Sequence, residues 1–155
     1  MDIQIKKLSS HDVRDFCELV EVFAAVFEMS AFKIPDDEYL QSLLNKPDFF
    51  ALVATFENKV IGGLTVYVLH QYYTQNPIAY IYDVGILAAY QRKGIGQKLI
   101  RYLTSYCKES GFEEAFVQVE TDDLQAMNFY RRTSFSNQLQ ATYFTYSAVK
   151  TNTDT

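Results

Sequence analysis

The periods at which apolar residues recur along the chain predict a mixed α/β protein. In residues 13–27 they recur at three- and four-residue steps, which predicts an amphipathic helix capped by Ser9 or Ser10. Residues 49–56 and 60–69 are instead rich in aromatic and β-branched side chains around a short polar turn, which predicts a β-hairpin. Further strands are predicted at residues 3–6, 79–86, 115–119 and 142–146, and further helices at residues 36–46, from Gly96 to Gly111, and at residues 121–132.

Length and composition predict one domain. The chain has 155 residues, of which 48% are hydrophobic, and this suffices for one compact core. We expect the domain to span residues 1–150, with 151–155 as a frayed tail. No apolar run is long enough to cross a bilayer, and the N-terminus lacks the apolar centre of a signal peptide. We therefore expect a soluble, cytoplasmic protein without a membrane partner.

The net charge and the positions of the cysteines limit the classes of partner and metal centre to be expected. The formal net charge is −5, which speaks against nucleic acid and suits a cationic partner. Cys17 and Cys107 have no C-x-x-C spacing, and with only His11 and His70 beside them a metal centre is not expected. Both cysteines fall on apolar helix faces, which predicts buried, inert thiols.

Residues 81–96 read as a strand, a short connection and the start of a helix. Bulky residues on both sides of the strand at 81–86 predict burial of both of its faces. Gly94 and Gly96 let the backbone come close to a ligand, and the helix start offers unpaired N–H groups to an anion such as phosphate. The common dinucleotide motif is excluded because Leu99 stands where it needs a third glycine, and the chain has no P-loop sequence. A tight turn without a ligand is the structural alternative.

The Gln-x-x-Gly-x-Gly spacing at residues 91–96 resembles the acetyl-coenzyme A signature of the GCN5-related N-acetyltransferases. The order of predicted elements also matches that family across nearly the whole chain. The resemblance implies a single-domain α/β (α+β) acetyltransferase fold, with a mixed, mostly antiparallel central sheet whose strands splay apart and about four flanking helices. It also implies acetyl-CoA as the cofactor.

In that family the splay leaves main-chain groups of the central strand free. The resemblance implies that residues 83–86 bind the pantetheine arm like an added strand, and that an N–H group near Ile86 polarises the thioester carbonyl. The pyrophosphate would lie on the N–H groups of residues 92–97. The implied cofactor-binding residues are Val84, Ile86, Gln91, Arg92, Lys93, Gly94, Ile95, Gly96 and Gln97.

Residues 126–135 resemble the family stretch A-x-x-x-Y-x-x-x-G-F, in which the tyrosine hydroxyl lies near the cofactor sulfur. By that resemblance Tyr130 would donate a proton to the departing thiolate. Ser134 departs from the pattern, because glycine is usual there, so the local turn is expected to differ. A tyrosine that only packs is the structural alternative.

Acetylation of an alkyl amine also needs a base, because the ammonium has a pKa near 10 and only the neutral amine attacks a carbonyl. Asp83 on the central strand is the candidate, and its structural alternative is a carboxylate satisfied by backbone N–H groups. Residues 63–69, 79–84 and 117–120, with the run from Pro35 to Leu40, resemble the small aminoglycoside 3-N-acetyltransferases. That resemblance implies Asp83 as base and substrate ligand, Glu120 and Asp123 as partners of substrate ammonium groups, and Asp36 or Asp37 at the other side. Plain helix capping explains Asp36 and Asp37 equally well.

Two other functions stay open at this point. One keeps the fold and takes a polyamine or a protein amine as substrate. The other is a non-catalytic module that binds acyl-CoA. A homodimer formed through the strand at 142–146 is a further expectation, although packing against the chain's own sheet explains its aromatic residues equally well.

Overall fold

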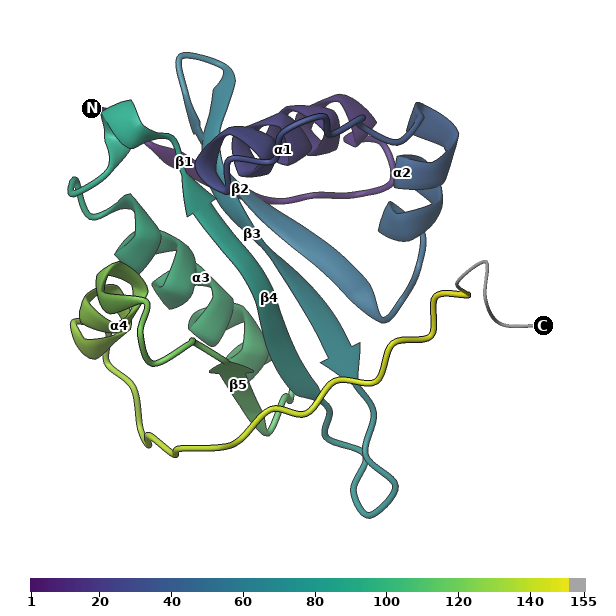
Figure 1. Ribbon diagram of the computed structural model, residues 1–155, viewed down its shortest axis with the longest axis vertical. Helices are drawn as coiled ribbons and strands as arrows, with labels where there is room; N and C mark the ends of the chain where they lie inside the picture. The colour runs from purple at the N-terminus through teal and green to yellow at the C-terminus, as the bar shows by residue number, and fades with distance from the viewer. Residues whose placement is uncertain (151–155) are drawn as a thin grey trace.

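A five-stranded sheet with helices on both faces organises the protein in the computed structural model, which describes residues 1–150 (Figure 1). The strands lie in the order β1-β2-β3-β4-β5; the first four are antiparallel, and β5 runs parallel to β4. This is the mixed, mostly antiparallel α/β fold that the sequence predicts. The elements are β1 (Gln4–Lys7), α1 (Val13–Val26), α2 (Asp37–Leu44), β2 (Phe49–Phe56), β3 (Lys59–Leu69), β4 (Ile78–Ile86), a 3₁₀ turn η1 (Ala88–Tyr90), α3 (Ile95–Glu109), β5 (Glu114–Val117) and α4 (Leu124–Arg131).

Two hydrophobic clusters lie on opposite faces of the sheet. Helices α1 and α2 pack over one face, where Phe16 and Leu19 of α1 meet Val53 of β2. Helix α3 covers the other face, where its Leu99 and Leu103 join the second cluster. Because α1 and α3 each have one apolar stripe, each can seal one sheet face, and the two layers follow from that.

The helix starts differ in part from the expected caps. The residue that precedes α1 is Asp12, whose carboxylate accepts from the N–H and hydroxyl groups of Ser9, so the prediction that Ser9 or Ser10 caps this helix was wrong. Asp36 caps α2 by accepting the N–H of Tyr39 at 2.9 Å. The capping interpretation of Asp36 is therefore confirmed.

The predicted hairpin is present as β2 and β3. Its turn residues Glu57 and Asn58 have φ angles of 50° and 62°, as a two-residue hairpin turn requires. The pairing shifts between Ala54 and Thr55, which leaves Ile61 as the extra residue directly before the glycine pair where a bulge was predicted.

A second bulge lies where β3 pairs with β4. Leu64 faces Val84 and Val66 faces Ile81, so Tyr82 and Asp83 together oppose Thr65. The N–H group of Asp83 donates to Thr65 Oγ1 at 3.3 Å. The bulge changes the direction of the β4 backbone at residue Asp83.

Strands β4 and β5 pair over only a short stretch. Residues 78–81 of β4 face residues 114–117 of β5, and from Tyr82 to Ile86 strand β4 continues without β5 beside it. The predicted splay is therefore present. The expected burial of both faces at 81–86 was wrong, because Tyr82 is 58% exposed and Asp83 is half-buried.

The predicted last strand at residues 142–146 was also wrong. Residues 133–150 form no strand in the described part of the chain, and Tyr143, Phe144 and Tyr146 are exposed. This sequence has high β-propensity, but a strand also needs a partner, and the segment runs alone past the ends of β5 and β4 (Figure 1). Pairing with a second copy stays a prediction, and the expected frayed tail at 151–155 lies outside the described residues.

Of the two cysteines, Cys107 is buried as expected, and burial raises the pKa of its thiol to about 11. Cys17 is only partly buried, and its Sγ donates to Asp37 Oδ1 at 3.3 Å. The prediction of a buried thiol was therefore wrong for Cys17, because α1 turns this residue toward the start of α2.

Candidate active site

A cradle of backbone donors forms where η1 ends and α3 begins. Arg92 and Gly94 have positive φ angles of 60° and 79°, which turn the chain sharply into the helix. The first helical hydrogen bond runs from the Lys98 N–H to the Gly94 carbonyl at 3.1 Å. In the described part of the chain no backbone acceptor takes the N–H groups of residues 92–97. These groups and the positive end of the α3 dipole are suited to an anionic ligand.

The side chain of Gln91 ties this cradle to the end of β4. Its Nε2 donates to the Ile86 carbonyl at 2.8 Å, and its Oε1 accepts from Gln125 Nε2 of α4 at 3.4 Å. Lys93 lies with its Nζ 5.8 Å from the ring centre of Tyr90. The sequence predicts Gln91 as a cofactor contact, and the structure adds that it fixes the loop against two neighbouring elements.

The edge of β4 that faces β5 is the second binding feature. Val84 and Ile86 lie on it, beyond the last residue that pairs with β5. An extended ligand can pair with such an edge through main-chain hydrogen bonds. The edge and the cradle are joined by a short connection. They fit the extended pantetheine arm and the pyrophosphate of the coenzyme A that the resemblance implies.

Asp83 and Tyr130 share one electrostatic environment. Burial raises the pKa of the Asp83 carboxyl above its usual range. Burial, with smaller effects from the charges of Asp123 and Asp83, raises the pKa of Tyr130 to about 12. Tyr130 is therefore protonated at any physiological pH and can only donate its proton. The charge of the Asp83 carboxylate is therefore felt at the Tyr130 phenol, and their roles as base and acid stay predictions.

The other predicted acidic residues fall into two groups. Glu120 is exposed just after β5, and its carbonyl accepts the Asp123 N–H at 3.0 Å. Asp123 caps α4 by accepting the Ala126 N–H at 3.1 Å. Asp36 and Asp37 make the α2 cap and the Cys17 contact, so both have structural roles. A role of these four carboxylates toward a substrate stays a prediction.

No functional role was predicted from the sequence for Thr65, Tyr67 or Tyr82. Among the residues that the structure describes, Thr65 is the one buried polar side chain, and its hydroxyl holds the N–H of Asp83. Tyr67 and Tyr82 lie beside Asp83 with their rings 5.4 Å apart. A threonine inside a strand rich in apolar residues was the available signal, but the register that places it opposite Asp83 cannot be read from the sequence.

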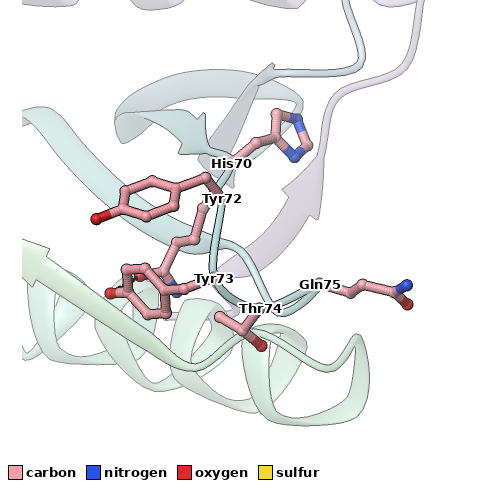
Figure 2. Close-up of a pocket in the computed structure, with 6 residues that line it drawn as sticks. His70, Tyr72, Tyr73, Thr74 and Gln75 are labelled. Atoms are coloured by element: carbon pink, nitrogen blue, oxygen red, sulfur yellow. Dashed lines mark hydrogen bonds between the residues drawn. The ribbon is translucent and has the colours of Figure 1, made fainter.

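Two hollows lie near the sheet. One, of about 390 Å³, lies between β5, α3, α4 and residues 133–141; Tyr130 and Ser134 both line it. The other, of about 440 Å³, is formed by His70–Gln75 alone (Figure 2). That loop projects beyond the end of the sheet (Figure 1), and it contains no carboxylate. Only the first hollow reaches a predicted catalytic residue.

Two classes of feature are absent from residues 1–150. No group of three or more histidine, cysteine or acidic side chains is placed to hold a metal ion there. None of the described helices combines the length and the apolar character needed to cross a membrane.

Comparisons with known proteins agree with this geometry. Two crystal structures of the aminoglycoside acetyltransferase meta-AAC0020 from an uncultured soil metagenomic sample, in complex with trehalose and with sisomicin, are 47% and 46% identical to the chain. Each superposes with a TM-score of 0.91 and covers 94% of this chain and 95% of that one. The aminoglycoside acetyltransferase HMB0005, also from an uncultured soil sample, is 26% identical with a TM-score of 0.83, over 95% of this chain and 100% of that one. N-alpha-acetyltransferase 50 of Danio rerio is 26% identical over 135 residues, which are 86% of this chain and 74% of that protein. The sequence model of the acetyltransferase (GNAT) family matches residues 16–135, and the chain belongs to this family.

Proposed function

We propose that this acetyltransferase acetylates an aminoglycoside antibiotic at its 3-amino group and thereby confers resistance. Its acyl donor is acetyl-CoA, as in its family. The observation that carries the proposal is the half-buried Asp83 on β4, beyond the last residue that pairs with β5, whose charge is felt at the Tyr130 phenol. Similarity to a sisomicin-bound acetyltransferase, at 46% identity over nearly the whole chain, supports the choice of substrate.

The chain's own residues supply an acid and a base. Asp83 accepts a proton from the substrate ammonium, directly or through water, and its raised pKa makes it a stronger base than an exposed aspartate. The neutral amine then attacks the activated acyl group that acetyl-CoA carries. As the carbon–sulfur bond breaks, Tyr130 gives its hydroxyl proton to the sulfur. The attacking nitrogen loses its second proton to water, Asp83 returns its proton to solvent and Tyr130 takes one from solvent, so the net products are the amide, the free thiol and one proton.

The donor would be held by main chain for the most part. In the proposal, the N–H groups of residues 92–97 bind the pyrophosphate, with Arg92 and Lys93 near its remaining charge. The free edge at Val84 and Ile86 binds the pantetheine arm. Ile95 is 2% exposed and packs in the hydrophobic core, so its contact with the cofactor stays a prediction.

Thiol release tests the proposal. The purified protein is incubated with acetyl-CoA and sisomicin or a gentamicin-type drug, and free thiol is measured. The product is then analysed by NMR to find which amine carries the acetyl group. If thiol is released but the acetyl group is found on another amine, aminoglycosides remain the substrate class and the proposed 3-amino position is refuted. No release with any aminoglycoside would refute the substrate.

A second substrate class follows from the similarity to an N-alpha-acetyltransferase. A peptide with a free N-terminus and a polyamine are tested in the same assay. A kcat/KM higher for the peptide than for every aminoglycoside would favour that alternative. A non-catalytic acyl-CoA module predicts coenzyme A binding without release of thiol from any amine.

A further inference from the structure

Tyrosine rings line the sheet surface beside Asp83. Tyr67 follows an unbroken buried run in β3 and is 39% exposed, and Tyr82 in β4 is 58% exposed. Their rings meet edge to face, with centres 5.4 Å apart and planes at 90°. Tyr80 meets Tyr82 in the same way at 5.9 Å and stacks flat on Phe116 of β5 at 4.7 Å. We call Tyr67, Tyr80 and Tyr82 the tyrosine platform.

The platform and Asp83 lie on the same face of the sheet. The bulge leaves Tyr82 and Asp83 together opposite Thr65, and the register places Tyr67 directly opposite Tyr80. The pKa values of Tyr67 and Tyr80 are raised, and burial is the main cause in both. The charge of Asp83 adds a smaller upward shift to each of these pKa values. Both hydroxyl groups are therefore within electrostatic range of the carboxylate.

Within residues 1–150, no lysine or arginine lies over the rings of the platform. In residues 1–150 the lysines that lie over aromatic rings are Lys7, over Phe50 and Tyr106, and Lys93, over Tyr90. The platform is thus a partly exposed aromatic surface beside a carboxylate, and no lysine or arginine of the described residues makes a cation–π contact with it. Packing alone would favour aliphatic or fully covered side chains here.

Such a surface suits a ligand with several ammonium groups on sugar rings. Tyrosine faces attract cations through the ring quadrupole, and they also pack against the apolar C–H faces of sugars. A carboxylate can bind one ammonium group, but a polycation needs further partners that do not each add a buried charge. Aromatic faces provide such partners.

We propose that the tyrosine platform is a subsite that binds a second ammonium group of a polycationic substrate whose reacting amine lies at Asp83. This inference rests on the proposed function, because it takes Asp83 as the place of the reacting amine. It assigns Tyr67 and Tyr82 to substrate affinity and leaves the chemical step to other residues. A single-amine substrate gains nothing from the platform.

The test compares Tyr82→Leu and Tyr82→Phe with the wild type. Calorimetry measures the Kd of sisomicin, and of glucosamine as a single-amine probe, with coenzyme A present; thiol release gives kcat and KM. Tyr82→Leu should weaken sisomicin binding roughly two- to fivefold, since a partly exposed cation–π contact contributes about that much. Its kcat and its glucosamine affinity should stay unchanged. Tyr82→Phe retains the ring quadrupole and should bind sisomicin like the wild type.

Tyr72→Leu is the matched control, because Tyr72 is 98% exposed in the loop of Figure 2. It should bind both ligands like the wild type, and circular dichroism checks that every variant is folded. Unchanged sisomicin affinity in Tyr82→Leu would overturn the subsite, and so would equal losses in Tyr82→Phe and Tyr82→Leu. If the wild type releases no thiol with any aminoglycoside, the proposed function fails, whereas the calorimetric comparison still decides on the subsite.

Discussion

Replacing Tyr130 by phenylalanine should remove the part of the alkaline loss of stability that the ionisation of this phenol is expected to cause. The folded-state pKa of about 12 exceeds the usual value of 10.0, chiefly because the side chain is buried. Below pH 10 the phenol is neutral in both the folded and the unfolded state, so it does not change the free energy of unfolding with pH. Between pH 10 and 12 the unfolded chain releases this proton and the folded chain keeps it. The free energy of unfolding should therefore fall by up to about 3 kcal/mol, or ~1.36 kcal/mol per pKa unit.

Urea unfolding followed by circular dichroism at pH 9 and pH 11.5 measures this effect. The quantity of interest is the difference between wild type and Tyr130→Phe at each pH, because the other tyrosines, lysines and arginines then cancel. Tyr146→Phe is the control, since Tyr146 is 91% exposed and should leave the pH dependence unchanged. Parallel pH profiles for wild type and Tyr130→Phe would refute the buried, high-pKa phenol. The same Tyr130→Phe protein should lose ~10²- to 10⁴-fold in kcat if the phenol is the general acid.

Three further predictions follow from the site and its backbone. Asp83→Asn should lower kcat/KM by ~10²-fold or more and remove the acid limb of the pH profile of kcat/KM. In the wild type this limb should lie above the usual aspartate pKa of 3.8, because burial raises the pKa of Asp83. Thr65→Val removes the side-chain acceptor of the part-buried Asp83 N–H and should cost about 1 kcal/mol of stability and reduce kcat, whereas Thr65→Ser should restore both. In thermal unfolding, Gly94→Ala should cost about 1–2 kcal/mol from its φ of 79° alone, since no atom lies near the added methyl group. Gly63→Ala should cost more, because its methyl group would come within 2.3 Å of the Leu52 carbonyl oxygen.

The sequence predicted those parts of the fold that depend on local pattern. The apolar stripes of α1 and α3, the hairpin of β2 and β3 and the cradle at Gly94 each depend on residues close together in the chain. Residues 142–146 have the same local signal as a strand, but pairing is a long-range event that no local period encodes. The prediction was wrong for that reason.

The candidate site divides in the same way. Asp83 and Tyr130 were predicted from runs of neighbouring residues, and the structure puts both in one environment. Thr65 was missed because its role depends on which residues of β4 lie opposite it, and that register follows from a bulge at Tyr82 and Asp83. A bulge leaves no clear mark in a sequence when it contains no glycine.

One backbone feature accounts for both the open edge and the altered acidity of the site. Parallel pairing with β5 ends at Ile81, and the bulge against β3 begins at the next residue, Tyr82. Past that point the β4 edge is free for an extended ligand, while Asp83 stays half-buried against the sheet, which raises its pKa. In a regular strand the alternation of side chains would turn residue 83 to the other face of the sheet. We therefore expect that deleting one residue of the bulge would abolish catalysis more completely than any single substitution at Asp83, because it would misplace the carboxylate and the donor edge together.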